Sequence, residues 1–504
     1  MMNQKKLGVA LSYIQIIVTM MVNLLYTPIM LRLLGQSEYG IYSLSNSVIG
    51  YLTLLYAGMT STYLRYYSQY KKKDDELSVA RLNGLFLVLF SVLGGCALII
   101  GIVLANNLHI ILGNGLTSDE YDLAQILFVI MAVNMALLMP KTVFSTVIFS
   151  HERFIFIKIL DVLQAMMMPI IALPLLYMGY GSIGMSCVGL LLTAASLLAS
   201  TYYCTKKLAC RFVFKNIPYG LIPDMLSFSI FILLQGVMDQ FNWHLGKLLL
   251  ANFVDSTAIA VYTVGLQIDM LIISFSVALS GVFVPKIYGL VQTGAIEELN
   301  KLWLKVGRYQ FFIVYFICTG FVFFGKAFIK LWAGEGYEMA YIVAILLGLP
   351  LVLHLCQVLA MEVLRAYNRH GVWTIVHFVA SIVGFIFCIP LTKHYGLMGV
   401  TIGTCITMFI VVNIYDNWYY AKAGNLNVWA FFKEMKKLLP AMLLTAVVAG
   451  ILVSVMAIES WLMLVITGGI FTILYSCIMY KLGMNNDERV LIKNALIKLS
   501  QKIK

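Results

Sequence analysis

Residues 180–186 read YGSIGMS and residues 395–401 read YGLMGVT, so the chain contains one short turn pattern twice, 215 residues apart. Each copy follows an apolar run that includes a proline, ALPLLYMG before the first copy and CIPLTKH before the second. Glycines in such a pattern allow a tight turn and a close approach of helices. The pattern therefore predicts either a common connection that is used twice or an internal repeat.

The composition predicts a membrane protein. The chain has 504 residues, of which 61% are hydrophobic and 12% are charged, and its mean hydropathy is +0.90. Long apolar runs without charge are typical of helices that cross a bilayer. The nine cysteines show no paired metal spacing and are interpreted as small apolar residues. Residues 1–31 are too long for a signal peptide and lack a small-residue cleavage site, so they predict a first spanning helix that is retained.

The apolar runs predict about fourteen transmembrane helices, since each crossing needs about 20 residues. An even number of helices places both termini on the same side of the membrane. With that side cytoplasmic, about 30 of the 35 lysines and arginines fall in cytoplasmic segments. The positive-inside rule then predicts cytoplasmic N- and C-termini. The net charge of +12 follows from this topology and does not indicate a nucleic-acid partner.

A second pair of segments supports the internal repeat. LLGQSEYGIY at residues 33–42 resembles LLANFVDSTAIAVY at residues 249–262. The last tyrosines of the two segments, Tyr42 and Tyr262, are 220 residues apart, and so are Gln15 and Gln235. Six predicted helices separate the repeated positions, and an even number gives a parallel repeat about an axis along the membrane normal. The predicted fold class is an all-α polytopic membrane protein with two six-helix lobes, at residues 1–222 and 223–437, and a terminal helix pair with a basic amphipathic tail at residues 438–504.

Polar side chains gather on the two repeat-related helices, and two similar halves most often transport a substrate through a site between them. Charged groups cost a few kcal/mol when they face hydrocarbon, so we expect these side chains to line a wet cavity. A structural pair, such as Asp239 with His244 or Lys247, is the alternative interpretation. The predicted cavity residues are Gln15, Thr19, Asn23, Arg65, Gln235, Gln240, Asn242, Trp243, His244 and Lys247, and the predicted ion-coupling residues are Asp239 and Asp269.

Motifs for enzymatic chemistry are missing from the sequence. It contains no GxxxxGK[ST], HExxH or GxSxG pattern, and no predicted loop exceeds about 20 residues. We therefore expect no catalytic residues, no cofactor and no metal site. A membrane-embedded enzyme of glycan assembly is kept as an alternative because its site could lie within the helices.

The chain resembles the multidrug/oligosaccharidyl-lipid/polysaccharide exporter superfamily, in particular the Wzx-type flippases of O-antigen and capsule synthesis. The resemblance lies in YTPIMLRLLGQSEYGIYSL at residues 26–44 and in the two YGxxG turns, and it covers essentially the whole chain. It implies a V-shaped protein of the bacterial inner membrane that moves undecaprenyl-diphosphate-linked oligosaccharide to the outer leaflet by alternating access. Members of the superfamily hold the diphosphate with cationic residues, and the candidates here are Arg65 and Lys247, with Arg32 near the outer mouth.

This resemblance leads to a mechanistic hypothesis. The glycan is expected to hydrogen-bond in the cavity and to stack on Trp243, while the polyprenyl tail stays in lipid. Asp239 or Asp269, together with His244, is expected to couple transport to a proton or sodium gradient. The main alternative is a multidrug/toxin cation antiporter of the same superfamily, which usually has about twelve helices. Because a two-lobed cavity can work in one chain, we expect a monomer.

Overall fold

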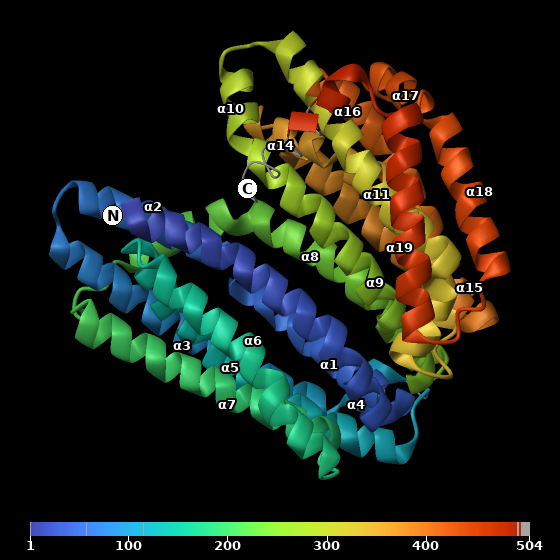
Figure 1. Cartoon of the computed structure of the whole chain (residues 1–504). Helices are drawn as coiled ribbons and strands as arrows, with labels where there is room; N and C mark the ends of the chain where they lie inside the picture. Colours follow the sequence, from blue (N-terminus) through green and yellow to red (C-terminus); the bar gives the residue numbers. More distant parts are fainter. Residues whose placement is uncertain (1, 57, 114, 491–492, 495–504) are drawn as a thin grey trace, which may run out of the picture. The chain divides into compact units, whose positions relative to one another are not determined.

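The computed structural model describes residues 2–56, 58–113, 115–490 and 493–494, and all regular secondary structure in these ranges is helical (Figure 1). Hydrocarbon offers backbone N–H and C=O groups no partners, and a helix satisfies them within itself. The prediction of an all-α fold is confirmed. The predicted amphipathic tail falls largely on residues 491–492 and 495–504, which lie outside the described residues.

The chain forms two compact units, each described here by itself. The first unit comprises Met1–Val264 with Thr374–Thr404, and the second comprises Gly265–Trp373 with Cys405–Lys504. In the first unit, α1, α3, α5, α6 and α7 pack side by side (Figure 1). The predicted lobes at residues 1–222 and 223–437 stay predictions.

The helices of the first unit are α1 (Met2–Gly50), α2 (Met59–Lys72), α3 (Glu76–Asn106), α4 (Leu108–Leu112), α5 (Ser118–Ser150), α6 (Phe154–Tyr177), α7 (Gly181–Tyr202) and α8 (Ile222–Phe253). The units share α9 (Ser256–Ser280) and α15 (His370–Met408). The second unit adds α10 (Val284–Gln292), α11 (Ile296–Ala333), α12 (Met339–Gly348), α13 (Leu351–Cys356), α14 (Val358–Ala366), α16 (Asp416–Gly424), α17 (Val428–Lys436), α18 (Leu439–Val455) and α19 (Trp461–Ile478).

Among the described residues, nine helices are long and apolar enough to cross a membrane, or ten if the bent pair of α17 and α18 forms one span. Two of the nine runs, Ile14–Lys72 with 59 residues and His370–Gly424 with 55, are much longer than the roughly 20 residues of one crossing. Non-helical backbone interrupts them at Gly35 and Gly396. The number of fourteen spans stays a prediction.

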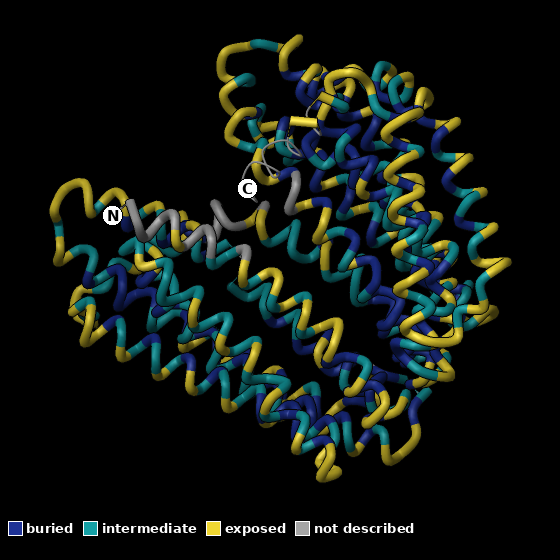
Figure 2. The backbone as a smooth tube through the Cα atoms, in the orientation of Figure 1, coloured by how far each residue is buried: buried dark blue, intermediate teal, exposed yellow. Residues whose placement is uncertain are grey.

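Large apolar side chains remain exposed along the length of many helices (Figure 2). On α18, Leu443, Val447 and Ile451 are spaced by four and form one exposed face. Soluble monomers rarely expose continuous apolar surface of this kind. These helix faces suit hydrocarbon, as expected for a multi-span membrane protein.

In both YGxxG turns the first glycine has a positive φ angle. The φ angles of Gly181 and Gly396 are 51° and 54°, in the left-handed region that favours glycine. Gly184 and Gly399 each lie against the helix that precedes the turn, where an added Cβ would meet its atoms. The matching geometry of both copies supports an internal repeat.

The first YGxxG turn contacts α1. The Ser182 backbone N–H, at the start of α7, donates a hydrogen bond of 2.5 Å to Oε1 of Glu38. A carboxylate at a helix N-terminus satisfies a free N–H group and interacts favourably with the helix dipole. A Cβ at Gly181 would overlap this carboxylate. The LGQSEYG and YGSIG segments therefore form one structural feature.

Positions that are 220 residues apart meet in the first unit. The hydroxyls of Ser43 and Thr263 lie 2.9 Å apart. Gly40 packs on the start of α9, where an added Cβ would overlap the Ser256 carbonyl and lie 3.4 Å from the Ala260 nitrogen. A two-fold axis brings equivalent positions of its two copies into contact. The Ser43–Thr263 and Gly40–Ala260 contacts therefore support the predicted parallel repeat.

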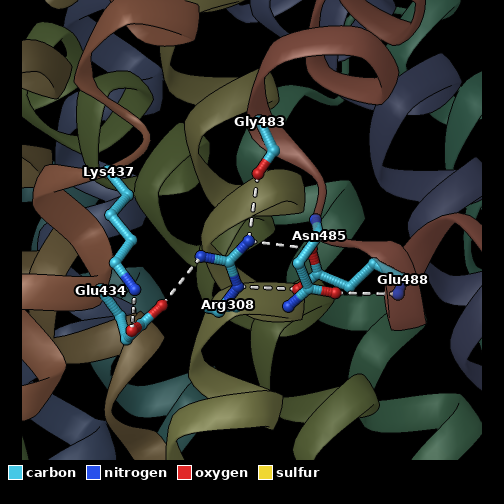
Figure 3. A network of polar contacts seen from close by, with 6 residues as sticks. All are labelled: Arg308, Glu434, Lys437, Gly483, Asn485 and Glu488. Carbon is cyan, nitrogen blue, oxygen red and sulfur yellow. Dashed lines mark hydrogen bonds and ion pairs between the residues drawn. The ribbon is translucent and has the colours of Figure 1, made fainter.

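In the second unit, a buried ion pair ties the chain after α19 to α11 (Figure 3). Nε of Arg308 lies 2.7 Å from Oε1 of Glu488, and Nη2 lies 2.8 Å from Oε2. Nη2 also donates to the Gly483 carbonyl at 3.0 Å. Nη1 lies 3.4 Å from Glu434, whose side chain is 29% exposed, whereas that of Glu488 is 4% exposed.

Replacing Glu488 with Gln is expected to lower the free energy of unfolding by about 3 kcal/mol, because it leaves a buried guanidinium uncompensated. The matched change Glu434→Gln removes the more exposed partner and is expected to cost less than about 1 kcal/mol. Unfolding of the detergent-solubilised protein, followed by tryptophan fluorescence, measures both. Equal losses for the two variants would contradict the assignment of Glu488 as the main partner.

Candidate functional site

The site is built around Lys247, a buried lysine on α8. Its Nζ donates to Oγ of Ser43 at 2.9 Å and to Oγ of Ser47 at 3.0 Å, both on the helix that follows Gly35. Both partners are neutral, and in the part of the chain that the structure describes Lys247 has no carboxylate within ion-pair distance. The Lys247 amine is therefore held by neutral hydroxyls, with no carboxylate among the described residues to pair with it.

The surrounding hydrogen bonds determine which group each serine and threonine hydroxyl donates to. The Ser47 hydroxyl donates to the Ser43 carbonyl at 2.8 Å, so its oxygen accepts from Lys247 and from Nδ1 of His244, which is 3.0 Å away. These directions assign the proton of a neutral His244 ring to Nδ1. The Ser43 hydroxyl donates to Thr263, whose own hydroxyl donates to the Ile259 carbonyl at 2.7 Å. These hydrogen bonds thus form one connected network between α1, α8 and α9.

Two further predicted residues on α8 have contacts within the first unit. Oδ1 of Asn242 accepts from the Ser381 hydroxyl on α15 at 2.9 Å. The backbone carbonyl of Gln240 accepts from the Tyr51 hydroxyl at 3.3 Å. Oε1 of Gln240 is buried and has no hydrogen-bond partner among the described residues.

Gln15 has a partner that the sequence did not suggest. Its Oε1 accepts a hydrogen bond of 2.8 Å from Nζ of Lys158 on α6, and Lys158 also lies 3.9 Å from Asp161. This contact adds a cation to the polar face predicted on α1. Of the other predicted residues, Thr19, Asn23, Arg65 and Asp239 are exposed, and Gln235 and Trp243 are half-buried.

Asp269, on α9 in the second unit, is buried to 1% exposure. Within the described ranges, neither carboxyl oxygen has a hydrogen-bond partner. Gly348, at the end of α12, packs against it, and an added Cβ there would lie 2.7 Å from Oδ1. A lone carboxylate at membrane depth is costly unless a proton or a cation neutralises it.

The hydroxyl partners of Lys247 were not among the predicted site residues. Ser43 and Ser47 are spaced by four and share one helix face, which is a signal that could have indicated them. Glu120, at the start of α5, was not predicted either, and it accepts hydrogen bonds from the hydroxyls of Ser37 and Ser256. The capping box that Glu120 forms with Thr117 is visible in the sequence, but its contacts with distant serines are not.

Solved structures place this fold among membrane transporters. The chain superimposes on "Lipid II flippase MurJ, inward closed conformation" with a TM-score of 0.71 and 16% identity, covering 94% of this chain and 99% of that one. An inward-facing multidrug resistance MATE family transporter of the MOP superfamily gives a TM-score of 0.69 and 16% identity, covering 84% of this chain and 99% of that one. The prediction of this superfamily's fold is confirmed.

The model of the family described as "Polysaccharide biosynthesis protein" matches residues 7–290. This is more than half of the chain, so the chain belongs to that family. A protein of Shigella flexneri named "Putative O-antigen transporter" is 19% identical over 402 residues, which is 78% of this chain and 91% of the relative. The "Uncharacterized membrane protein EpsK" of Bacillus subtilis is 20% identical over 482 residues, or 92% and 93% of the two chains. The relatives with a named activity are transporters or flippases, in agreement with the prediction that the chain is not an enzyme.

Replacing Ser47 with Ala is expected to destabilise the protein by about 1–3 kcal/mol, because Lys247 and His244 both lose a buried acceptor. The matched change is Ser45→Ala, since Ser45 is also buried but bonds only to the Ile41 carbonyl of its own helix. Removing the Ser45 hydroxyl is expected to lower the free energy of unfolding by less than about 1 kcal/mol. Unfolding in detergent compares the variants, and equal losses would refute the acceptor role of Ser47.

Proposed function

We propose that this chain moves an undecaprenyl-diphosphate-linked oligosaccharide from the inner to the outer leaflet of the bacterial cell membrane by alternating access. The observation that carries the proposal is membership of the polysaccharide biosynthesis family through residues 7–290. One relative is named for O-antigen transport, and one structure with the same fold is a lipid II flippase. Both names support a lipid-linked glycan as the substrate class.

Lys247 is the proposed ligand of the diphosphate. Its charge is solvated by Ser43 and Ser47 but is not cancelled, so an anionic group can still be attracted to it. A hydrogen bond to a charged group contributes about 1.5–3 kcal/mol, and more than one such contact is needed for tight binding. Arg65, which is exposed on α2, is the proposed second cation.

The glycan is proposed to contact the neutral polar side chains. Oε1 of Gln240 is buried without a partner in the described part of the chain, and Asn242 can exchange its bond with Ser381 for one with a sugar hydroxyl. Gln15, Thr19, Asn23 and Gln235 supply further amide and hydroxyl groups, with Trp243 as a stacking surface and His244 beside Lys247. The polyprenyl tail stays in lipid. The chain acts as a monomer, with both termini in the cytoplasm as the positive-inside pattern favours.

Cells that lack this chain are expected to accumulate an undecaprenyl-linked oligosaccharide, which mass spectrometry of lipid extracts detects. Cells that also lack the initiating glycosyltransferase are the control and should contain none. Re-expressed Lys247→Met is expected to transport at least about tenfold less than the wild type, while Lys326→Met, at an exposed site on α11, restores transport. Normal lipid intermediates together with new sensitivity to cationic dyes would refute the flippase proposal and favour a drug exporter.

Coupling to a proton or sodium gradient is proposed to use Asp269, with Asp239 as the alternative. The support is the burial of Asp269 without a hydrogen-bond partner among the described residues, since a carboxylate in such a place is stabilised by an entering proton or cation. Asp239 lies exposed on α8, where an ion can reach it.

The variant Asp269→Asn is expected to remove the dependence of transport on an imposed gradient, because the amide cannot exchange a proton or hold a cation through a charge. Proteoliposomes that contain labelled lipid-linked oligosaccharide measure transport with and without a pH or sodium gradient. Asp239→Asn is the matched control and should keep the gradient dependence. The reverse pattern would move the coupling role to Asp239, and full gradient dependence in both variants would refute coupling through either acid.

A further inference from the structure

A cysteine, a histidine and a second cysteine meet beside the connection between α7 and α8. Sγ of Cys210 lies 3.7 Å from Nε2 of His151, which follows α5, and 3.9 Å from the Leu208 carbonyl. Nδ1 of His151 lies 2.9 Å from the Val147 carbonyl, so this nitrogen carries a proton and Nε2 is the atom that faces sulfur. The Cys210 backbone N–H donates to the Cys204 carbonyl at 3.1 Å, which holds the two cysteines together.

The cluster borders a cavity of about 330 Å³ that belongs entirely to the first unit. Cys210 and His151 are half-buried and line it, whereas the Cys204 side chain is fully buried behind them. A small reagent can therefore reach Cys210 but not Cys204. The other titratable groups that line the cavity are Tyr67, Lys71, Asp74, Asp75, Glu76 and Arg211.

The neighbours of Cys210 favour its thiolate. A hydrogen bond with Cys204 and the contact with His151 lower the pKa of Cys210 below its ordinary value, although burial acts in the opposite direction. The same contact with Cys210 raises the pKa of His151, against burial and the nearby charge of Lys71. The lowered pKa of Cys210 and the raised pKa of His151 both favour a thiolate–imidazolium pair near neutral pH.

We propose that Cys210 is a modification site for small electrophilic oxidants of the peroxide class, and that Cys204 is its resolving thiol. The Cys210 thiolate attacks one oxygen of hydrogen peroxide, an S–O bond forms, the O–O bond breaks, and the leaving hydroxide takes a proton to become water. Cys204 then attacks the sulfenic sulfur, an S–S bond forms, and hydroxide leaves with the proton of Cys204 as a second water. Two thiols lose two electrons in total, and one peroxide gains them.

For Cys210 this proposal differs from the interpretation of all nine cysteines as small apolar residues. That interpretation applies to a thiol within an apolar helix. Cys210 instead lies outside the helices, beside the basic side chain of His151. The site does not depend on the substrate that the protein transports.

The rate of Cys210 alkylation by iodoacetamide, measured on the purified full-length protein by peptide mass spectrometry, tests the thiolate. Between pH 6.5 and 8.5 the wild-type rate is expected to change less than about twofold, because the thiolate is already formed at the lower pH. In His151→Gln the rate is expected to rise up to roughly 50-fold over that interval, as for a thiol whose pKa is near 8.5. A wild-type rate that rises in this way would overturn the proposal, whether or not the variant folds.

Peroxide treatment tests the resolving thiol. In the wild type we expect a Cys204–Cys210 disulfide, detected as a cross-linked peptide that dithiothreitol releases. In Cys204→Ser we expect no disulfide, and Cys210 instead retains sulfenic acid that dimedone traps. Dimedone labelling of Cys210 in the wild type, without a disulfide, would overturn the role of Cys204. Oxidation of Cys204 at an unchanged rate in Cys210→Ser would overturn the role of Cys210.

Discussion

Hydrocarbon offers no hydrogen-bond partner to a backbone, so every N–H and C=O group of a spanning segment must be satisfied within the protein. Long helices meet this requirement, and the described part of the chain is built from them. The difficult places are the breaks, where helix ends leave free groups. At the start of α7 the chain meets this need with Glu38, which accepts a hydrogen bond from Ser182 beside a glycine turn. Glu120 similarly bonds the hydroxyls of two serines. The breaks in the helices thus coincide with polar contacts between distant segments.

Buried charges face the same constraint, and the protein meets it in three ways. Arg308 is fully paired with Glu488 and a carbonyl, which is typical of a structural contact. Lys247 is bonded to neutral hydroxyls, and no described carboxylate pairs with it. Asp269 has no hydrogen-bond partner in the described ranges. A buried charge with a structural role is fully paired within the protein. A group that binds a substrate anion or a coupling ion must instead be able to form a further bond. This difference separates Lys247 and Asp269 from Arg308 as candidates for function.

Local patterns were sufficient to predict the all-helical fold and the repeated turn, because hydropathy and the glycines of YGxxG act through neighbouring residues. Gly181 and Gly396 have nearly the same φ angle for that reason. The partners of polar side chains could not be predicted in the same way. Lys158 bonds Gln15 across 143 residues of sequence, and Lys247 meets Ser43 only because two helices cross. A serine on a helix most often bonds its own preceding turn, so its sequence gives no sign of a second contact. Cys210 and His151 are likewise brought together by tertiary packing.

The repeat also explains why the chemistry lies mainly on one half. With an offset of 220 residues, Gln235 corresponds to Gln15, and this pair has kept its side chain. The charged and aromatic residues of α8 have different counterparts on α1. At the same offset, Asp239, Trp243, His244 and Lys247 correspond to Thr19, Asn23, Leu24 and Thr27, respectively. A two-fold arrangement of identical halves would place two lysines close to the axis, where they would repel each other. A hydroxyl at the position of Thr27 avoids this repulsion. An asymmetric arrangement of this kind fits the substrate proposed above, which has an anionic group at one end and a neutral polar glycan at the other.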